Sequence, residues 1–362
     1  MASDEISSAI KEVEERVKEL LRSYREFIIS EQGQAWIRER DERHRKYREL
    51  FSRDNIDNLT EEDIAEVIAE LWANAGWTNK QYIVERVLRN NKLEDLKQAF
   101  KKLLWSEEPL GDRFDEFFKK VKNIGLAAAT EIACFTKPDE FFIWNERCRE
   151  GLRALGLDKV VPVNKYRLRG QEYEKVVELG KRLSRLMSEE GVGQNLIDVD
   201  IFLYSLVTGQ LKTTLVQPIQ RIEEDYDFDH DEIVEKLVEI GNSLGFEAEE
   251  EVLISSGARV DVVWRANIGV LSSVEFVFEV HKSGSLDSTV LNLLRAKGRP
   301  TVQRLIIVSN TKGINVFKKE ISSLPEEFRK IVAYLEAKEV LEASSLIRRI
   351  NEILITKLNL TV

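Results

Sequence analysis

The sequence is short of several residue types, and each shortage excludes a class of protein. Cys134 and Cys148 are the two cysteines among 362 residues, so there is neither a disulfide framework nor a CxxC metal motif, and we expect a reducing, cytoplasmic setting. No apolar run reaches the roughly 18 residues of a membrane span, and the acidic, polar N-terminus is unlike a signal peptide. P-loop, GxGxxG and GxSxG motifs are missing, so nucleotide motors, dinucleotide enzymes and serine hydrolases gain no support.

The composition is that of a folded protein with more than one domain. Hydrophobic residues make up 43% of the chain and charged residues 33%, which is enough for two or three cores at this length. The net charge of −10 excludes a chain that is basic throughout, although nucleic acid needs only a local basic surface. Abundant Glu, Lys, Arg and Ile with two methionines favour a thermophilic source.

The densest pattern of predicted strands lies between residues 246 and 310. Three runs rich in Val, Ile and Phe are separated by Gly and Ser, so each is expected to be a strand. Helical spacing of apolar residues precedes and follows these runs. The predicted elements are, in order, a helix over 231–244, three strands, a helix over 286–297 with Leu291 and Leu294 on its apolar side, and a strand over 304–309.

Two acids lie inside these predicted strands. Asp261 is in the second, within Arg-Val-Asp-Val-Val-Trp, and Glu279 is in the third, within Phe-Val-Phe-Glu-Val-His-Lys. A carboxylate within an apolar strand is costly unless it is paired or binds a metal. Alternation puts Glu279 on one face of its strand, and the other face carries an apolar set that should point into the core, Phe276, Phe278 and Val280. Adjacent strands thus offer two carboxylates and the Val280 carbonyl to one hard cation.

The element order and these motifs resemble the PD-(D/E)xK nuclease superfamily, the restriction-endonuclease-like fold, over residues 227–322. That family has an αβββαβ core, with an Asp on its second strand and an acid-x-Lys on its third. The resemblance implies that Asp261 and Glu279 hold Mg²⁺ or Mn²⁺, which activates a water for attack on a phosphodiester bond, and that the chain is an endonuclease. The sequence departs from the family at the third position, where His281 stands and the lysine comes one residue later, as Lys282.

This departure leaves the catalytic roles open. His281 is a candidate to orient or deprotonate the water, and Lys282 is another if a bulge turns it inward. Glu235 or Glu239, on the preceding helix, is a candidate for a further acid, which some members of the superfamily use. Strand acids taken singly are often edge or solvated residues, so the sequence also fits a nuclease fold that has lost catalysis and serves as a DNA-binding or scaffold protein.

The N-terminal stretch, from Ile6 to about Phe51, is predicted to be almost wholly helical, with a possible interruption at Gly33. Basic residues crowd its second half, among them Arg40 and Arg43, and suggest an arm that contacts phosphates. Acidic residues are interleaved with them, so a solvated, self-paired helix fits equally well. The first half also fits a partner-binding or dimerising helix.

A compact helical region is predicted from a start at Thr60, which has Asp63 three residues on, to about Leu206. Within it, the sequence around Ile124-Gly125-Leu126-Ala127 is similar to a helix-hairpin-helix element. The resemblance implies that backbone amides at Gly125 and Ala127 hold a DNA phosphate. One of the two usual hairpin glycines is present.

The segment that follows the hairpin also resembles the helix-hairpin-helix DNA glycosylases, in which an Asp follows the apolar run. Ile143-Trp144 is followed here by Asn145, and an amide cannot supply the catalytic carboxylate. The resemblance therefore implies a DNA-binding relative rather than a base-excision enzyme. Capping of a helix over 146–155 accounts for Asn145 in either case.

A polar loop over 164–170 brings Lys165, Arg167 and Arg169 next to Tyr166. Basic residues around an aromatic ring suit neutralisation of a nucleic-acid backbone together with base stacking. A solvated loop fits the same residues. The acidic stretch that ends at His230 and Asp231 is interpreted as a helix start below an exposed linker, not as a metal site.

The predicted fold class is multidomain α and α/β. An N-terminal all-α, helix-hairpin-helix-like domain is expected to precede an αβββαβ restriction-endonuclease-like core with C-terminal helices. The expected partner is nucleic acid, DNA in the first place, with a homodimer through the N- or C-terminal helices and no membrane; an interaction subunit is the remaining alternative. The predicted segments are an arm at 1–53, the helical domain at 54–206, a linker at 207–230, the nuclease-like domain at 231–322 and C-terminal helices at 323–362.

Overall fold

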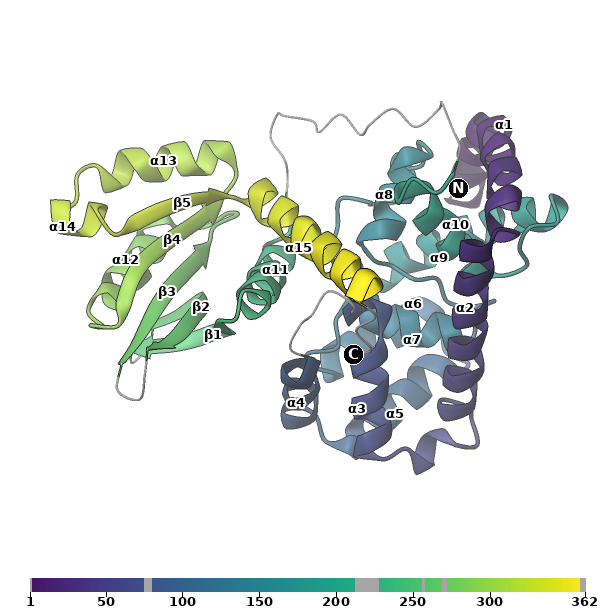
Figure 1. Cartoon of the computed structure of the whole chain (residues 1–362), viewed down its shortest axis with the longest axis horizontal. Helices are drawn as coiled ribbons and strands as arrows, with labels where there is room; N and C mark the ends of the chain where they lie inside the picture. Colours follow the sequence, from purple (N-terminus) through teal and green to yellow (C-terminus); the bar gives the residue numbers. More distant parts are fainter. Residues whose placement is uncertain (1, 75–79, 212–227, 256–257, 269–271, 359–362) are drawn as a thin grey trace. The chain divides into compact units, whose positions relative to one another are not determined.

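The computed structural model describes residues 2–74, 80–211, 228–255, 258–268 and 272–358. The described residues up to Leu211 form one compact unit, and those from Phe228 onward form a second. The first is helical, and the second is a mixed sheet with helices (Figure 1). The linker expected at 207–230 lies largely outside the described residues.

The described residues of the helical unit form α-helices and two 3₁₀ turns. Its elements are α1 (Ala2–Ile28), α2 (Glu31–Leu50), η1 (Ile56–Asn58), α3 (Glu61–Glu70), η2 (Trp72–Asn74), α4 (Lys80–Asn90), α5 (Leu93–Trp105), α6 (Leu110–Lys120), α7 (Leu126–Thr136), α8 (Glu146–Ala154), α9 (Gly170–Glu189) and α10 (Leu196–Val207).

The sequence suggested that residues 1–53 form a separate arm. In the structure, the described residues of this stretch belong to the helical unit. One hydrophobic core runs from α1 to α10, and Val17, Leu20 and Tyr24 of α1 are at most 1% exposed within it. The Tyr24 ring meets Phe202 of α10 edge-on, with 5.4 Å between ring centroids. The apolar stripe of α1 is therefore buried inside its own unit and is not a free dimerisation surface.

The break between α1 and α2 comes at Ser30, three residues before the glycine expected to cause it. The Ser30 hydroxyl accepts a hydrogen bond from the Gly33 N–H at 3.1 Å and so caps α2. A Cβ at Gly33 would lie 2.1 Å from the Phe27 carbonyl oxygen, so only glycine fits this tight turn. The Thr60 start is confirmed, because Thr60 and Asp63 form a reciprocal capping box at α3.

The second unit has the element order predicted from the sequence, helix, three strands, helix, strand, followed by further elements. It comprises α11 (His230–Ser243), β1 (Glu247–Ser255), β2 (Ala258–Ile268), β3 (Ser272–Val280), α12 (Leu286–Lys297), β4 (Val302–Ser309), α13 (Thr311–Ile321), α14 (Glu326–Arg329), β5 (Val332–Glu336) and α15 (Ala337–Leu358).

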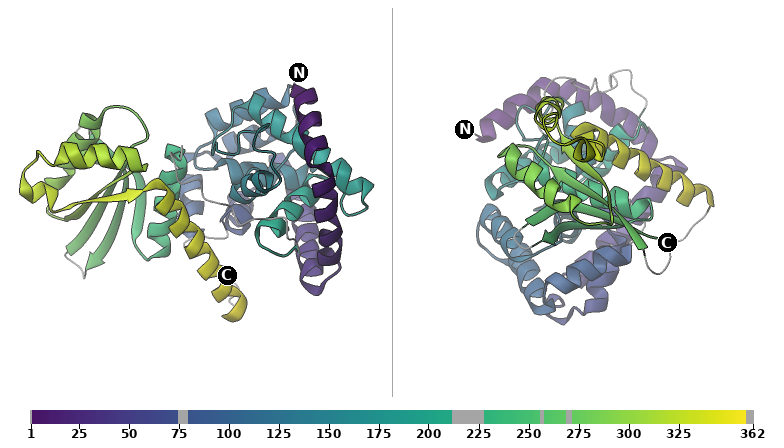
Figure 2. Two further views of the ribbon diagram at one scale, coloured as in Figure 1. Left: turned by 90° about the horizontal axis from the view of Figure 1, so that it is seen from above. Right: turned by 90° about the vertical axis from the view of Figure 1, so that its left-hand side faces the viewer.

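The five strands form one twisted sheet in the order β1-β2-β3-β4-β5 (Figures 1 and 2). The β1–β2 and β2–β3 pairs are antiparallel, and the β3–β4 and β4–β5 pairs are parallel. Helix α12 makes the crossover between the parallel strands β3 and β4, as a parallel connection requires.

Helices cover both faces of the sheet. On one face, Val263, Val277 and Leu305 lie side by side across β2, β3 and β4, in a core that includes Leu293 of α12 and Phe317 of α13. On the other face, the Trp264 indole N–H donates to the Leu237 carbonyl of α11 at 2.9 Å, and its ring packs on Phe278. The face of β3 that carries Glu279 is therefore as enclosed as the apolar face that was expected to point inward.

Two further expectations differ from the structure. Leu291 and Leu294 of α12 are 46% and 38% exposed, and the buried side of this helix carries Val290, Leu293 and Ala296 instead. Residues 325–358 were expected to form helices, but this stretch contains the strand β5, which pairs with β4. Pairing with the parallel strand β4 outweighs the helical spacing of the apolar residues, because strand formation depends on tertiary context.

Candidate functional site

Asp261 lies where the β2–β3 ladder stops. The last residue pair of this ladder is Val262 with Phe278, so the same register would bring Asp261 opposite Glu279 one step later. There the Val280 N–H donates to Asp261 Oδ2 at 2.7 Å instead of to a backbone carbonyl. The carboxylate thus replaces a ladder partner at the point where the strand pair ends, and its side chain is 25% exposed.

Glu279 is buried, at 6% exposure, and its carboxylate is incompletely hydrogen-bonded by the described residues. Among the described residues its Oε1 has no hydrogen-bond partner. Burial, and secondly the charge of Asp261, raise the pKa of Glu279 to about 8. An acid whose charge is opposed both by burial and by a neighbouring acid is suited to a cation that would pair with both.

Glu275, on the same face of β3, shows how this protein neutralises a buried acid. Its carboxylate accepts from Arg265 Nε at 3.0 Å, from Arg299 at 2.8 Å and from the Thr301 hydroxyl at 2.7 Å. Glu275 is thus fully paired within the protein. Glu279, four residues further along β3, is not fully paired by the described residues.

His230, the first residue of α11, joins the acid pair from a third element. Its Nε2 lies 3.5 Å from Asp261 Oδ2, and its Nδ1 lies 3.1 Å from Asp231 Oδ1. Hydrogen bonds to Asp231 and then to Asp261 raise the pKa of His230 to about 10. Sequence reasoning missed this residue, because the surrounding acids were interpreted as a helix start. That interpretation is itself correct, since Asp229 caps α11.

His281 is turned toward the helices that cover its face. Its Nδ1 lies 3.3 Å from the Thr289 hydroxyl of α12, and its ring meets Phe317 of α13 edge-on. Burial lowers the pKa of His281, and the charge of Asp261 opposes this. A neutral imidazole close enough to sense the Asp261 charge can accept a proton. Lys282 is exposed in the loop that follows.

The two helix acids proposed as additional groups have different settings. Glu239 is paired within the protein: Arg348 of α15 donates to it at 2.7 and 2.9 Å, and Lys236 and Ser344 both donate at 3.1 Å. The charges of Lys236 and Arg348, together with their hydrogen bonds, lower the pKa of Glu239 to about 2 against the effect of burial. Glu239 therefore joins α11 to α15 and is not available as a ligand. Glu235 is half-buried on the same helix.

The acid pair offers an incomplete set of ligands for a metal ion. Among the described residues, no three His, Cys, Asp or Glu side chains come together closely enough to hold a metal by themselves. Two carboxylates with the partnerless Glu279 Oε1 nevertheless fit Mg²⁺, which usually keeps several waters and takes one or two carboxylates plus substrate phosphate.

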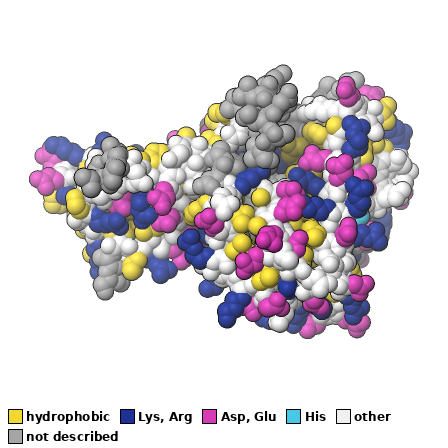
Figure 3. Space-filling model, turned by 60° about the horizontal axis from the view of Figure 1, so that its bottom comes forward, with side chains coloured by type: hydrophobic (Ala, Val, Ile, Leu, Met, Phe, Trp, Pro, Cys, Tyr) yellow, Lys and Arg dark blue, Asp and Glu magenta, His cyan; other side chains and the backbone are white. Residues whose placement is uncertain are grey.

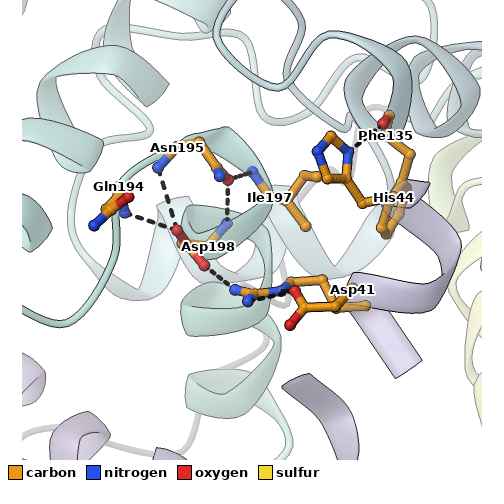
Figure 4. Close-up of polar contacts among 8 residues, drawn as sticks. Asp41, His44, Phe135, Gln194, Asn195, Ile197 and Asp198 are labelled. Atoms are coloured by element: carbon orange, nitrogen blue, oxygen red, sulfur yellow. Dashed lines mark hydrogen bonds and ion pairs between the residues drawn. The ribbon is translucent and has the colours of Figure 1, made fainter. Parts of the chain in front are cut away.

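Arg40 and Arg43, expected to contact phosphates, are engaged inside the helical unit. Arg40 forms ion pairs with Asp41 and with Asp198 of α10 (Figure 4). Asp198 is 7% exposed and also accepts from the Gln194 N–H at 2.7 Å. Arg43 stacks over the Trp72 ring at 5.0 Å and donates to the Glu70 carbonyl. These contacts match the alternative in which the basic residues pair with groups of the protein itself.

The hairpin between α6 and α7 is held by the end of α4. Asn91 accepts from the Lys122 N–H at 2.8 Å and donates to the Lys122 carbonyl at 2.7 Å. Asn123 adopts φ +61°, a left-handed conformation that glycine otherwise supplies. Gly125 is exposed at the α7 N-cap and makes no side-chain cap, so the first amides of α7 are in a geometry suited to an anion.

The remaining candidates of the helical unit are a cap and a basic loop. Asn145 accepts from the Cys148 N–H at 2.8 Å and caps α8, as predicted. Lys165, Arg167 and Arg169 are exposed before α9, and Lys165 forms an ion pair with Glu172. Among the described residues, acidic and basic side chains are interspersed over the face shown in Figure 3 and form no continuous basic surface there.

Comparisons with protein-family models, with curated proteins and with solved structures gave no match to this chain. In the part of the chain that the structure describes, no helix combines the length and apolar character needed to cross a bilayer.

Proposed function

We propose that this chain is a metal-dependent endonuclease that hydrolyses phosphodiester bonds of nucleic acid, DNA in the first place. The observation that carries the proposal is the acid pair at the end of the β2–β3 ladder. Among the described residues, Glu279 Oε1 has no hydrogen-bond partner, and Asp261 contacts the Val280 N–H and His230 through Oδ2. One oxygen of each acid is left for a cation, inside the αβββαβ order that the PD-(D/E)xK resemblance implies.

Each residue of the site has a role that follows from its setting. Asp261 and Glu279 would hold the Mg²⁺ or Mn²⁺, whose charge would neutralise the scissile phosphate and favour ionisation of the attacking water. His281 is kept neutral by burial and can accept the proton that the water loses as it attacks phosphorus. The P–O bond to the leaving oxygen breaks as the new P–O bond forms.

The helical unit supports nucleic acid as the substrate. The α6–α7 hairpin presents the amides of α7 next to an exposed Gly125, and Lys165, Arg167 and Arg169 are exposed on a loop of the same unit. Backbone amides at a helix start and exposed cations are the groups that contact phosphates without reading sequence.

A second candidate function, a binding platform without catalysis, is favoured by the contacts of His281. In the resembled family a lysine occupies this position, whereas His281 here contacts Thr289 and Phe317. A third candidate, a homodimer or interaction subunit, is favoured by α15, where Leu346, Ile350 and Ile353 follow at helical spacing and are each more than 50% exposed.

The test is cleavage of labelled duplex, single-stranded and forked DNA and of RNA, with Mg²⁺, Mn²⁺ or EDTA. We expect the wild type to cut at least one substrate and Asp261→Asn to lose the activity by at least about a hundredfold. Glu251→Gln, at an exposed acid of the same sheet, is the matched control and should cut as the wild type does.

Equal cleavage by Asp261→Asn or in EDTA would contradict the proposal. A salt-sensitive gel shift without cleavage would support the binding platform. If the protein neither cleaves nor binds nucleic acid, the interaction subunit remains as the candidate function.

A further inference from the structure

His230 touches the acid pair without belonging to either of its strands. Its Nε2 lies 3.5 Å from Asp261 Oδ2, and the Val280 N–H donates to the same oxygen at 2.7 Å. Among the described residues, these two contacts of Asp261 thus fall on one oxygen. Two donors on Oδ2 restrict the rotation of the carboxylate and so fix where its other oxygen, Oδ1, can lie.

The imidazole is itself held in place by the start of α11. Asp229 Oδ1 accepts from the N–H groups of Asp231 and Glu232 at 3.0 and 3.1 Å, which fixes the backbone of the first turn. Asp231 Oδ1 lies 3.1 Å from His230 Nδ1, so a carboxylate faces each ring nitrogen. This orients the ring with Nε2 toward Asp261.

Helix stability does not explain a histidine at this position. The N-terminus of a helix favours acidic side chains and disfavours a cation, as Asp229, Asp231 and Glu232 illustrate. The His230 side chain is also 39% exposed, so it is not a core residue. Its contact with Asp261 is the interaction that accounts for its place.

We propose that His230 is a positioning residue of the cation site, which holds Asp261 Oδ2 so that Oδ1 faces the metal ion. The inference rests on the proposed cation site and extends it from two strands to the first turn of α11. It also supplies, from another element, a basic group that contacts an acid of the pair, whereas His281 is bound to Thr289 and Phe317.

The test measures Mn²⁺ affinity by electron paramagnetic resonance and cleavage as a function of Mn²⁺ concentration, on the full chain at one fixed pH. We expect His230→Ala to bind Mn²⁺ about 10- to 100-fold more weakly, since loss of a residue that orients a ligand has effects of this size. His230→Gln keeps an N–H donor and should recover part of the affinity. Excess Mn²⁺ should restore cleavage to His230→Ala but not to Asp261→Asn.

The control is His44→Gln, at a histidine of the helical unit whose Nδ1 lies 2.6 Å from the Phe135 carbonyl oxygen; it should bind Mn²⁺ as the wild type does. Circular dichroism melts identify any variant that fails to fold, and the glutamine variant then carries the test. Wild-type affinity in both His230 variants would overturn the role of His230 and leave the cation site standing. No Mn²⁺ binding by the wild type would overturn both.

Discussion

Glu279 is a buried acid whose Oε1 has no hydrogen-bond partner among the described residues, whereas Glu275 on the same strand has two arginines. Its folded pKa of about 8 lies well above the value of about 4.3 expected in the unfolded chain. Between these two values the folded state binds one proton more than the unfolded state. The contribution of Glu279 to stability is therefore present at low pH and is lost as the pH rises toward 8.

Glu279→Gln should consequently stabilise the protein in alkaline solution. In EDTA, the unfolding free energy of the variant minus that of the wild type should grow from about pH 5 to about pH 8, by at most about 1.4 kcal/mol per pH unit, and then level off. Urea unfolding at several pH values measures this. A difference that does not vary with pH would show that the acid is already paired in the folded protein.

Sequence patterns singled out Asp261 and Glu279 as candidates but not His230. Asp261 and Glu279 stood out because a strand interior disfavours a carboxylate. His230 could not be assigned to them, because its acidic neighbours also make a good helix start and the contact joins residues 31 positions apart. The choice between a phosphate contact and self-pairing stayed open for Arg40 for the same reason, because its partner Asp198 lies 158 residues away.

The elements themselves were more predictable than their faces. Thr60 and Asn145 were recognised as caps because a cap is a local interaction. β5 was not recognised, since Ile331, Tyr334 and Leu335 also fit a helix and only pairing with β4 decides between the two. Which side of α12 is buried likewise depends on the sheet beneath it, and Leu291 and Leu294 lie on the other side.

The cap at α8 rests on a single side chain, Asn145. Asn145→Ala should destabilise the helical unit by about 1 kcal/mol, because the Cys148 N–H loses its acceptor, whereas Asn145→Asp keeps an acceptor oxygen and should change stability by less than about 0.5 kcal/mol. Chemical denaturation followed by circular dichroism measures both variants. Equal losses in the two would mean that the amide, not the cap, is what the structure needs there.

For the whole molecule, composition alone indicated several domains but not their boundary. The first 53 residues looked like an arm because their apolar stripe and basic run are continuous in sequence. In the structure that stripe is buried in the core that runs from α1 to α10. The partners of such a stripe are chosen by tertiary packing, which a single sequence does not display.

The proposed site requires that Asp261 and Glu279 together hold a divalent cation. Titration of Mn²⁺ into the full-length protein, followed by electron paramagnetic resonance, tests it before any substrate is known. We predict one site in the wild type and in Glu251→Gln, and its loss in the double variant Asp261→Asn/Glu279→Gln. Equal Mn²⁺ binding by the double variant, or no binding by the folded wild type, would contradict the account.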